Sequence, residues 1–136
     1  MSGQRSGNGS RKSAVVASLS AMAYKILDPA SMDAGPGPHP AASPFDKRVS
    51  EALGLSAFEV YQVDLPPGAE TVRHDHLDDG VEDLYFIVSG HGWVLVDDEQ
   101  LTILPGRFVA VSVESERQLR AGNSGLSFVA LCGVPR

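Results

Sequence analysis

The chain has 136 residues and a formal net charge of −6, with 17 acidic against 11 basic side chains. This length fits a single domain around one hydrophobic core, and the acidic balance argues against a nucleic-acid binder, which needs a basic surface to meet phosphates. No apolar run approaches the length that crosses a bilayer, so a membrane span is not expected.

Residues 1–13 are rich in glycine, serine and basic side chains. We expect residues 1–21 to form a disordered extension. A short apolar stretch follows at residues 14–23, and its segment Ala21-Met-Ala23 has the small-x-small pattern of a signal-peptidase site. Two serines interrupt that stretch. We therefore favour the extension, with Met22 as the natural start, over a signal peptide.

The next segment is punctuated by proline. Between Pro29 and Pro44 the chain carries five of its nine prolines, together with Gly35 and Gly37. Such a segment cannot hold a regular helix or a central strand. Residues 22–44 are therefore predicted to be a linker or a wrapping arm, and residues 45–136 to be the compact domain.

The compact domain reads as a series of short strands. Residues 49–55 favour a helical turn, and Phe58 to Leu65 favours a strand that ends at Pro66-Pro-Gly68. Further strands are expected at residues 71–76, 84–88, 92–96, 100–104, 108–113, 118–120 and 126–131. Glycine, proline or aspartate marks most of the breaks between them, which is typical of an all-β sandwich or barrel.

The one cysteine, Cys132, excludes an intramolecular disulfide. It lies in the apolar run 126–134, so we expect a buried thiol. Cysteine usage of this kind is typical of a reducing compartment and favours a cytoplasmic location.

A pair of histidines is the strongest chemical signal. His74 and His76 are separated by one residue and precede Glu82 and Asp83. In an extended strand, side chains two positions apart share a face, so both imidazoles would point the same way. Two imidazoles and a carboxylate from a neighbouring strand make a site for a divalent transition metal with positions left open for substrate.

These residues resemble the first motif of the cupins, small jelly-roll barrels whose motif runs Gly, five residues, His-x-His, three or four residues, Glu, six residues, Gly. Gly68, His74 and His76 match in order and spacing, and Gly90 supplies the last glycine. Counting back from Gly90 puts Asp83 in the glutamate position, and the linker after His76 is longer than the family's. Either Glu82 or Asp83 is therefore the candidate carboxylate.

The second cupin motif is altered. Pro105-Gly106, the strand 108–113 and Asn123 match, but the position of the histidine that completes the metal shell falls at or near Arg117. Arginine stays protonated and does not coordinate a cation. The resemblance covers residues 58–133 and implies a cupin-type jelly-roll β-barrel and a homodimer. It implies no particular reaction, because the family includes oxygenases, lyases, isomerases and non-catalytic modules.

Arg117 leaves three alternatives open. The guanidinium would clamp an anionic group of a substrate beside the metal, or it would pair with Asp83 or Glu82 and replace the metal's charge, or it would lie on the surface. Strand parity puts Asp83, Tyr85 and Ile87 on one face. Tyr85 is then either a proton donor in the barrel or an aromatic residue of the core.

The functional expectation is a cupin enzyme that acts on a small molecule with a divalent metal held by His74, His76 and Glu82 or Asp83. An anionic substrate group is one option, with Arg117 to hold it. Iron, manganese, nickel, copper and zinc all accept such ligands, and Arg117 and Tyr85 are the candidate catalytic residues. Two alternatives stay open. One is a non-catalytic, metabolite-binding or dimerising cupin, and the other is a metal-independent isomerase or cyclase.

Overall fold

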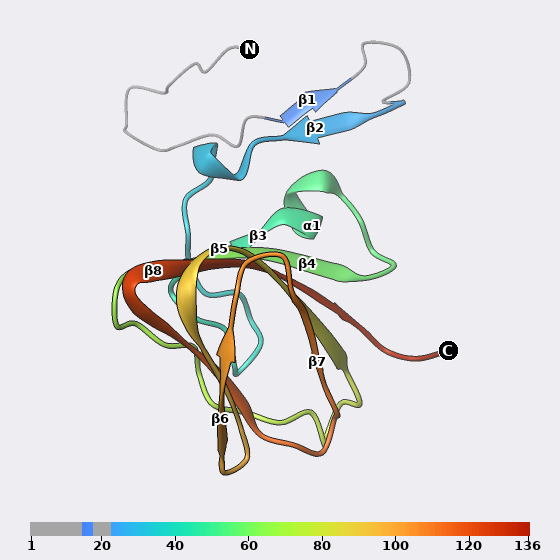
Figure 1. Ribbon diagram of the computed structural model, residues 1–136. Coiled ribbons are helices and arrows are strands. Elements are labelled where there is room, and N and C mark those ends of the chain that lie inside the picture. Colours follow the sequence, from blue (N-terminus) through green and yellow to red (C-terminus); the bar gives the residue numbers. More distant parts are fainter. Residues whose placement is uncertain (1–14, 18–22) are drawn as a thin grey trace.

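The computed structural model describes residues 15–17 and 23–136. One antiparallel sheet in the order β3-β4-β8-β5-β6, with β7 paired to β5, curls around a single core (Figure 1). Its strands are β3 (Asp46–Arg48), β4 (Glu59–Leu65), β5 (Glu82–Val96), β6 (Glu99–Ile103), β7 (Phe108–Val111) and β8 (Arg117–Gly133). The all-β barrel predicted from the spacing of turn residues is confirmed.

The alternation of side chains explains which face of each strand is buried. In β5, Asp83, Tyr85 and Ile87 are buried, whereas Glu82 is exposed and Leu84 is half-buried. This matches the predicted parity, because successive strand residues point to opposite faces. Among the residues that the structure describes, the core contains twelve buried hydrophobic ones: Val63, Leu65, Tyr85, Ile87, Val94, Ile103, Val111, Leu119, Ala121, Leu126, Phe128 and Ala130.

Two predicted breaks are wrong. The sequence indicated turns at Ser89-Gly90 and at 122–125, but β5 and β8 each run through these points as single curved strands (Figure 1). They pair along both halves, with register shifts between Ile87 and Ser89 and between Gly90 and Gly92. Glycine here permits a bend within the strand, as at a β-bulge, instead of ending it.

The segment predicted as a strand at residues 71–76 is also irregular. It makes only isolated bridges to β8, Glu70 with Arg120 and His74 with Arg117. His76 is held separately, because its backbone N–H donates to the carbonyl of Val113 at 2.9 Å. Extended backbone at these bridges still places His74 beside the start of β8.

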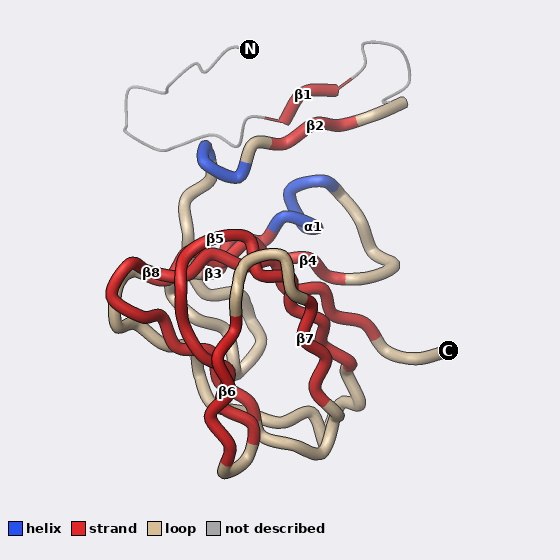
Figure 2. The backbone as a smooth tube through the Cα atoms, in the orientation of Figure 1, coloured by secondary structure: helices blue, strands red, loops and turns tan. Residues whose placement is uncertain are grey.

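The N-terminal part lies outside this sheet. β1 (Val15–Ala17) pairs with β2 (Lys25–Leu27), and the 3-10 turn η1 (Pro29–Ser31) follows. Apart from β1, the extension expected at residues 1–21 lies outside the described residues. Figure 2 shows the stretch from η1 to β3 as loop, as its prolines predicted, before α1 (Val49–Leu53).

No helix among residues 15–17 and 23–136 is long and apolar enough to cross a bilayer. Cys132 lies on β8 opposite Asp83 and Glu59, and its side chain is half-buried, whereas the sequence predicted full burial. The thiol lines a cavity at the end of the barrel, which accounts for this difference.

The bend of β5 gives a test of the fold. Gly90 has a φ of 90°, and a Cβ there would lie 2.2 Å from the carbonyl oxygen of Gly125. Gly90→Ala should therefore lower the free energy of unfolding by about 3 kcal/mol, from backbone strain and overpacking together. Urea unfolding measures this change.

Gly106→Ala is the matched control. Its φ is 82°, but nothing lies within 4 Å of the added Cβ, so only the backbone strain of about 1 kcal/mol is expected. Equal losses in the two variants would show that β5 and β8 do not approach each other closely at this bend.

Candidate functional site

A cavity of about 440 Å³ lies against strands β4, β5 and β8. Strands β4 and β8 supply apolar walls through Val63, Phe128 and Ala130, and the loop before β3 supplies a further wall through residues 37–43. Among the polar lining residues, His74, His76 and Asp83 lie together, and Asp46 and Glu59 line the cavity as well. A mostly apolar pocket with a few convergent polar groups is the usual form of a small-molecule site.

The backbone brings Arg117 and His74 to this side. The two residues exchange hydrogen bonds, with His74 N–H donating to the Arg117 carbonyl at 3.1 Å and Arg117 N–H donating to the His74 carbonyl at 2.8 Å. Directly opposed residues of an antiparallel bridge project to the same face. The irregular segment before residue 76 therefore aligns the histidine pair with the first residue of β8.

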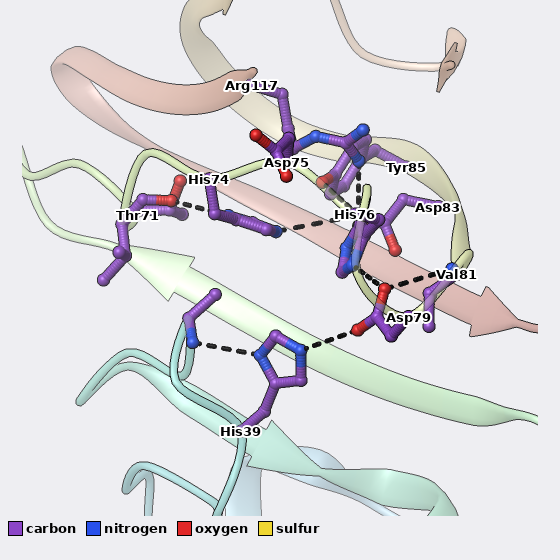
Figure 3. Close-up of polar contacts among 12 residues, drawn as sticks. His39, Thr71, His74, Asp75, His76, Asp79, Val81, Asp83, Tyr85 and Arg117 are labelled. Carbon is purple, nitrogen blue, oxygen red and sulfur yellow. Dashed lines mark hydrogen bonds and ion pairs between the residues drawn. The ribbon is translucent and has the colours of Figure 1, made fainter. Parts of the chain in front are cut away.

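Asp83 is the centre of the polar cluster (Figure 3). Its Oδ2 accepts hydrogen bonds from Arg117 Nη1 at 2.6 Å, from Tyr85 Oη at 3.0 Å, and from His76 Nε2 at 2.9 Å when that nitrogen carries a proton. The side chain is only 3% exposed. Its second oxygen, Oδ1, is buried without a hydrogen-bond partner in the described structure, so this carboxylate has an unused lone pair.

Arg117 is fully buried, at 0% exposure, and its donors are engaged. Nη1 binds Asp83, Nη2 donates to the carbonyls of Ser112 and Ser115, and Nε donates to Ser115. The guanidinium lies behind Asp83 and does not line the cavity. Of the three arrangements open to Arg117, the structure therefore shows the ion pair with Asp83, and the surface position is wrong.

His76 lies between two carboxylates. Its Nδ1 is 2.9 Å from Oδ1 of Asp79, and its Nε2 is 2.9 Å from Oδ2 of Asp83. A carboxylate oxygen only accepts hydrogen bonds, so both ring nitrogens face acceptors. The inner nitrogen must therefore carry a proton, or the space beside it must hold another cation.

His74 is arranged differently. Its Nδ1 lies 2.8 Å from the carbonyl of Val72, which fixes the proton on Nδ1 and leaves the lone pair on Nε2. Nε2 lies 3.9 Å from Oδ2 of Asp83, and the ring packs edge-on against His76 with centroids 4.8 Å apart. Burial, above all, lowers the pKa of His74, so the ring is neutral near neutral pH and offers that lone pair to the cavity.

Tyr85 combines the two roles weighed for it. Its ring packs against Phe128 in the core, with centroids 5.8 Å apart, and its hydroxyl donates to Asp83. Burial and then the charge of Asp83 raise the pKa of this phenol, and the same two causes raise the pKa of the Cys132 thiol. Both groups therefore stay protonated, and proton transfer by Tyr85 remains a prediction.

Two residues in contact with His76 were missed by the sequence reasoning. Asp79 contacts His76 and also His39, whose Nε2 lies 3.2 Å from Asp79 Oδ2. Partial burial raises the pKa of Asp79, but hydrogen bonds from Val81 N–H and from the two histidines outweigh this and lower it to about 2. His39 comes from the proline-rich segment, where only its being one of four histidines would have drawn attention to it.

Burial distinguishes the two candidate carboxylates. Asp83 points into the cavity, whereas Glu82 is exposed on the other face of β5. One ligand atom each from His74, His76 and Asp83 lies within 4.8 Å of the others. Imidazole and carboxylate donors with anchored outer nitrogens suit a divalent transition metal, so these residues fit such an ion, with Arg117 in place of a fourth ligand.

Comparison with known proteins identifies the fold. No protein-family model and no curated protein matches the chain. A cupin protein from Bacteroides fragilis is 24% identical, with a TM-score of 0.60 over 73% of this chain and 84% of that chain. A cupin-superfamily sugar phosphate isomerase from Silicibacter pomeroyi is 21% identical, with a TM-score of 0.65 over 79% of this chain and 74% of that one.

A third similar structure is a predicted oxalate decarboxylase from Thermotoga maritima, 23% identical, with a TM-score of 0.55 over 63% of this chain and 74% of that chain. At these identities the likeness shows the fold alone. The chain has the cupin barrel fold, which confirms the expectation drawn from its two motifs.

The buried ion pair predicts a large effect on stability. Arg117→Met should lower the free energy of unfolding by about 3–5 kcal/mol, because it leaves the Asp83 carboxylate buried without its permanent counter-charge. Asp83→Asn in the same chain should restore part of the loss. Urea unfolding of the single and double variants measures both changes.

Arg120→Met serves as the comparison on the same strand. Arg120 pairs with Glu70 at 2.9 Å, but the two side chains are 37% and 47% exposed, so its loss should cost less than about 1 kcal/mol. A loss in Arg117→Met no larger than that of Arg120→Met would mean that the Asp83 pair is solvated.

Proposed function

We propose that this chain is an enzyme that transforms a small organic molecule in the barrel cavity, with a divalent transition metal held by His74, His76 and Asp83. The observation that carries the proposal is the convergence of the three donors within 4.8 Å at the cavity, whose wall also contains Val63, Phe128 and Ala130. Iron, manganese, nickel, copper and zinc all accept this ligand set.

The outer contacts of the two histidines support this assignment. His74 Nδ1 is fixed on a backbone carbonyl and His76 Nδ1 on the Asp79 carboxylate, so both Nε2 atoms face inward. Metal-binding histidines typically have such partners, because the outer hydrogen bond fixes the tautomer and orientation of the ring. A cation beside His76 Nε2 would also remove the need for a proton between it and Asp83.

The remaining residues hold this arrangement and shape the cavity. Arg117 and Tyr85 both donate to Asp83 Oδ2 and fix the carboxylate, which leaves Oδ1 free. Phe128 and Val63 line the apolar side and exclude water from it. A bound divalent metal would polarise a substrate oxygen or engage dioxygen.

The charges in the cavity bear on the substrate. Arg117 is engaged behind Asp83, so it is not free to clamp an anionic group. Recognition of an anion would therefore depend on the metal's charge. Two similar structures bear the names sugar phosphate isomerase and predicted oxalate decarboxylase, and these support a small, oxygen-rich, anionic substrate.

A second candidate is a metal-independent isomerase or cyclase. The Arg117–Asp83 ion pair favours it, because a permanent cation 2.6 Å from Asp83 Oδ2 competes with a metal for the carboxylate. His74 would then act as the general base, since its ring is neutral and its Nε2 lone pair faces the cavity. Under this alternative, the proton on His76 Nε2 completes the contact with Asp83.

The homodimer inferred from the resemblance remains a proposal. An apolar stripe on the outer face of β7, β5 and β8 supports it: Phe86 pairs with Phe108 and Val129 across the strands, and Phe108 is 66% exposed. Phe108→Glu should convert the dimer to a monomer in sedimentation velocity, since it places a charge in the contact. A wild-type monomer at all concentrations would contradict the proposal.

We also propose a cytoplasmic location. It rests on the single cysteine, which cannot form an intramolecular disulfide and suits a reducing compartment.

Metal content tests the proposed function. Protein purified without added metal or a histidine tag should carry a stoichiometric transition metal by elemental analysis. His74→Ala, His76→Ala and Asp83→Asn should lose it, because each removes one of the three donors. Circular dichroism checks that each variant is folded.

Two variants control for loss of a histidine or of a carboxylate elsewhere. His91→Ala removes an exposed histidine packed on Trp93, and Glu82→Gln removes the exposed carboxylate next to Asp83. Both should keep the metal. A wild-type protein that neither contains metal nor takes up zinc would contradict the metal site and leave the acid–base candidate, which predicts turnover that chelators do not abolish.

A further inference from the structure

A second layer of hydrogen bonds lies outside the three donors and joins the barrel to the proline-rich segment before it. Asp79 stands at its centre (Figure 3), with His76 Nδ1 at 2.9 Å from one oxygen and His39 Nε2 at 3.2 Å from the other. The backbone N–H of Val81 also donates to Asp79 at 3.2 Å. One carboxylate therefore connects a residue of the site to a residue of the arm.

The direction of each bond follows from the neighbours of the rings. Ala41 N–H donates to His39 Nδ1 at 3.0 Å, so the proton of a neutral His39 ring is on Nε2 and points at Asp79. His39 Nε2 thus donates to Asp79, and His76 Nδ1 donates to it when that nitrogen carries a proton. His39, His76 and Asp79 lie close enough together to form a second metal-binding group. The hydrogen bonds to Asp79 account for this closeness without a cation.

The arm forms one wall of the cavity. Gly37, His39 and residues 41–43 all line it. At its far end the arm is anchored on β3, because Ser43 donates to both oxygens of Asp46 at 3.0 and 2.8 Å, and Gly35 N–H donates to the Asp46 carbonyl at 2.8 Å. Between these anchors, the contact with Asp79 ties the arm to the histidine side of the cavity.

We propose that the chain His39–Asp79–His76 couples closure of the cavity by the arm to the orientation of His76, so that Asp79 and His39 are positioning residues of the site. When the arm is docked, Asp79 is held against His76 and turns Nε2 inward. When a contact at His76 Nε2 fixes the ring, His76 holds Asp79 in the position where it also binds His39. The zinc-binding experiment described below rests on the proposed function, whereas the coupling itself does not.

Coupling of this kind is reciprocal. A cation that fixes His76 must stabilise the docked arm by the same factor by which the docked arm increases cation affinity. The factor is modest, because His39 and Asp79 are 43% and 40% exposed, and exposed pairs contribute little.

Hydrogen exchange on the metal-free protein tests the coupling directly. The amides of Ala41 and Ala42, which bond to His39, report on the arm. They should exchange about two- to fivefold faster in His39→Ala and in Asp79→Ala. The same is expected in His76→Ala, which removes the contact of His76 with Asp79 and its ring contact with His39, whose centroid lies 5.7 Å away. In a His39→Ala background, His76→Ala should add nothing. His39→Gln, which keeps an N–H donor, should restore part of the protection.

Asp78→Ala, the exposed neighbour of Asp79, is the matched control and should exchange like wild type. Arm amides that exchange in His76→Ala as they do in wild type would overturn the coupling, as would additive effects of His39→Ala and His76→Ala. These outcomes are decided without any metal.

Zinc binding gives the second readout. In a competition titration with Zn²⁺ alone, Asp79→Ala should weaken binding by about 10- to 100-fold, as loss of an outer partner of a metal-binding histidine does. His39→Ala should weaken it by about two- to fivefold, and saturating Zn²⁺ should slow exchange of the arm in wild type. Unchanged affinity in Asp79→Ala would overturn the positioning role. A wild type that binds no zinc would instead defeat the proposed metal site, and the exchange data would still decide the coupling.

Discussion

The buried pair between Arg117 and Asp83 constrains everything else in the site. It joins the first residue of β8 to the start of β5, and the same guanidinium holds the loop of Ser112 and Ser115. Neither charge is tolerable in the interior without the other. The position of Asp83, and through it that of His76 and Tyr85, is therefore set by a permanent cation that belongs to the protein.

Much of this arrangement followed from local patterns. The period of two placed Asp83 and Tyr85 on one face of their strand and Glu82 on the other, because successive strand residues point to opposite sides. Which of the two carboxylates faces the core was not predicted. The spacing of His74 and His76 gave their common direction even though their segment is irregular, since a single bridge to Arg117 is enough to keep the backbone extended there.

What could not be predicted depends on contacts between distant segments. In the sequence, a glycine that permits a bend within a strand cannot be distinguished from one that makes a turn. The continuity of β5 and β8 is therefore visible only in the pairing of the two strands. The depth of Arg117 depends on carbonyls that a β7–β8 loop turns inward. His39 and Asp79 are forty residues apart, and nothing in either local sequence signals the other.

The origin of one cavity wall changes what counts as the functional unit. Composition places the start of the compact domain near residue 45, and the strands of the barrel do begin there with β3. Yet residues 37–43 close one side of the cavity. A shortened chain cut at the apparent domain boundary would retain the barrel strands and all three donor side chains. Without the wall formed by residues 37–43, these side chains would be exposed to bulk water. Ligand selectivity measured on such a fragment would describe a different receptor from the whole polypeptide.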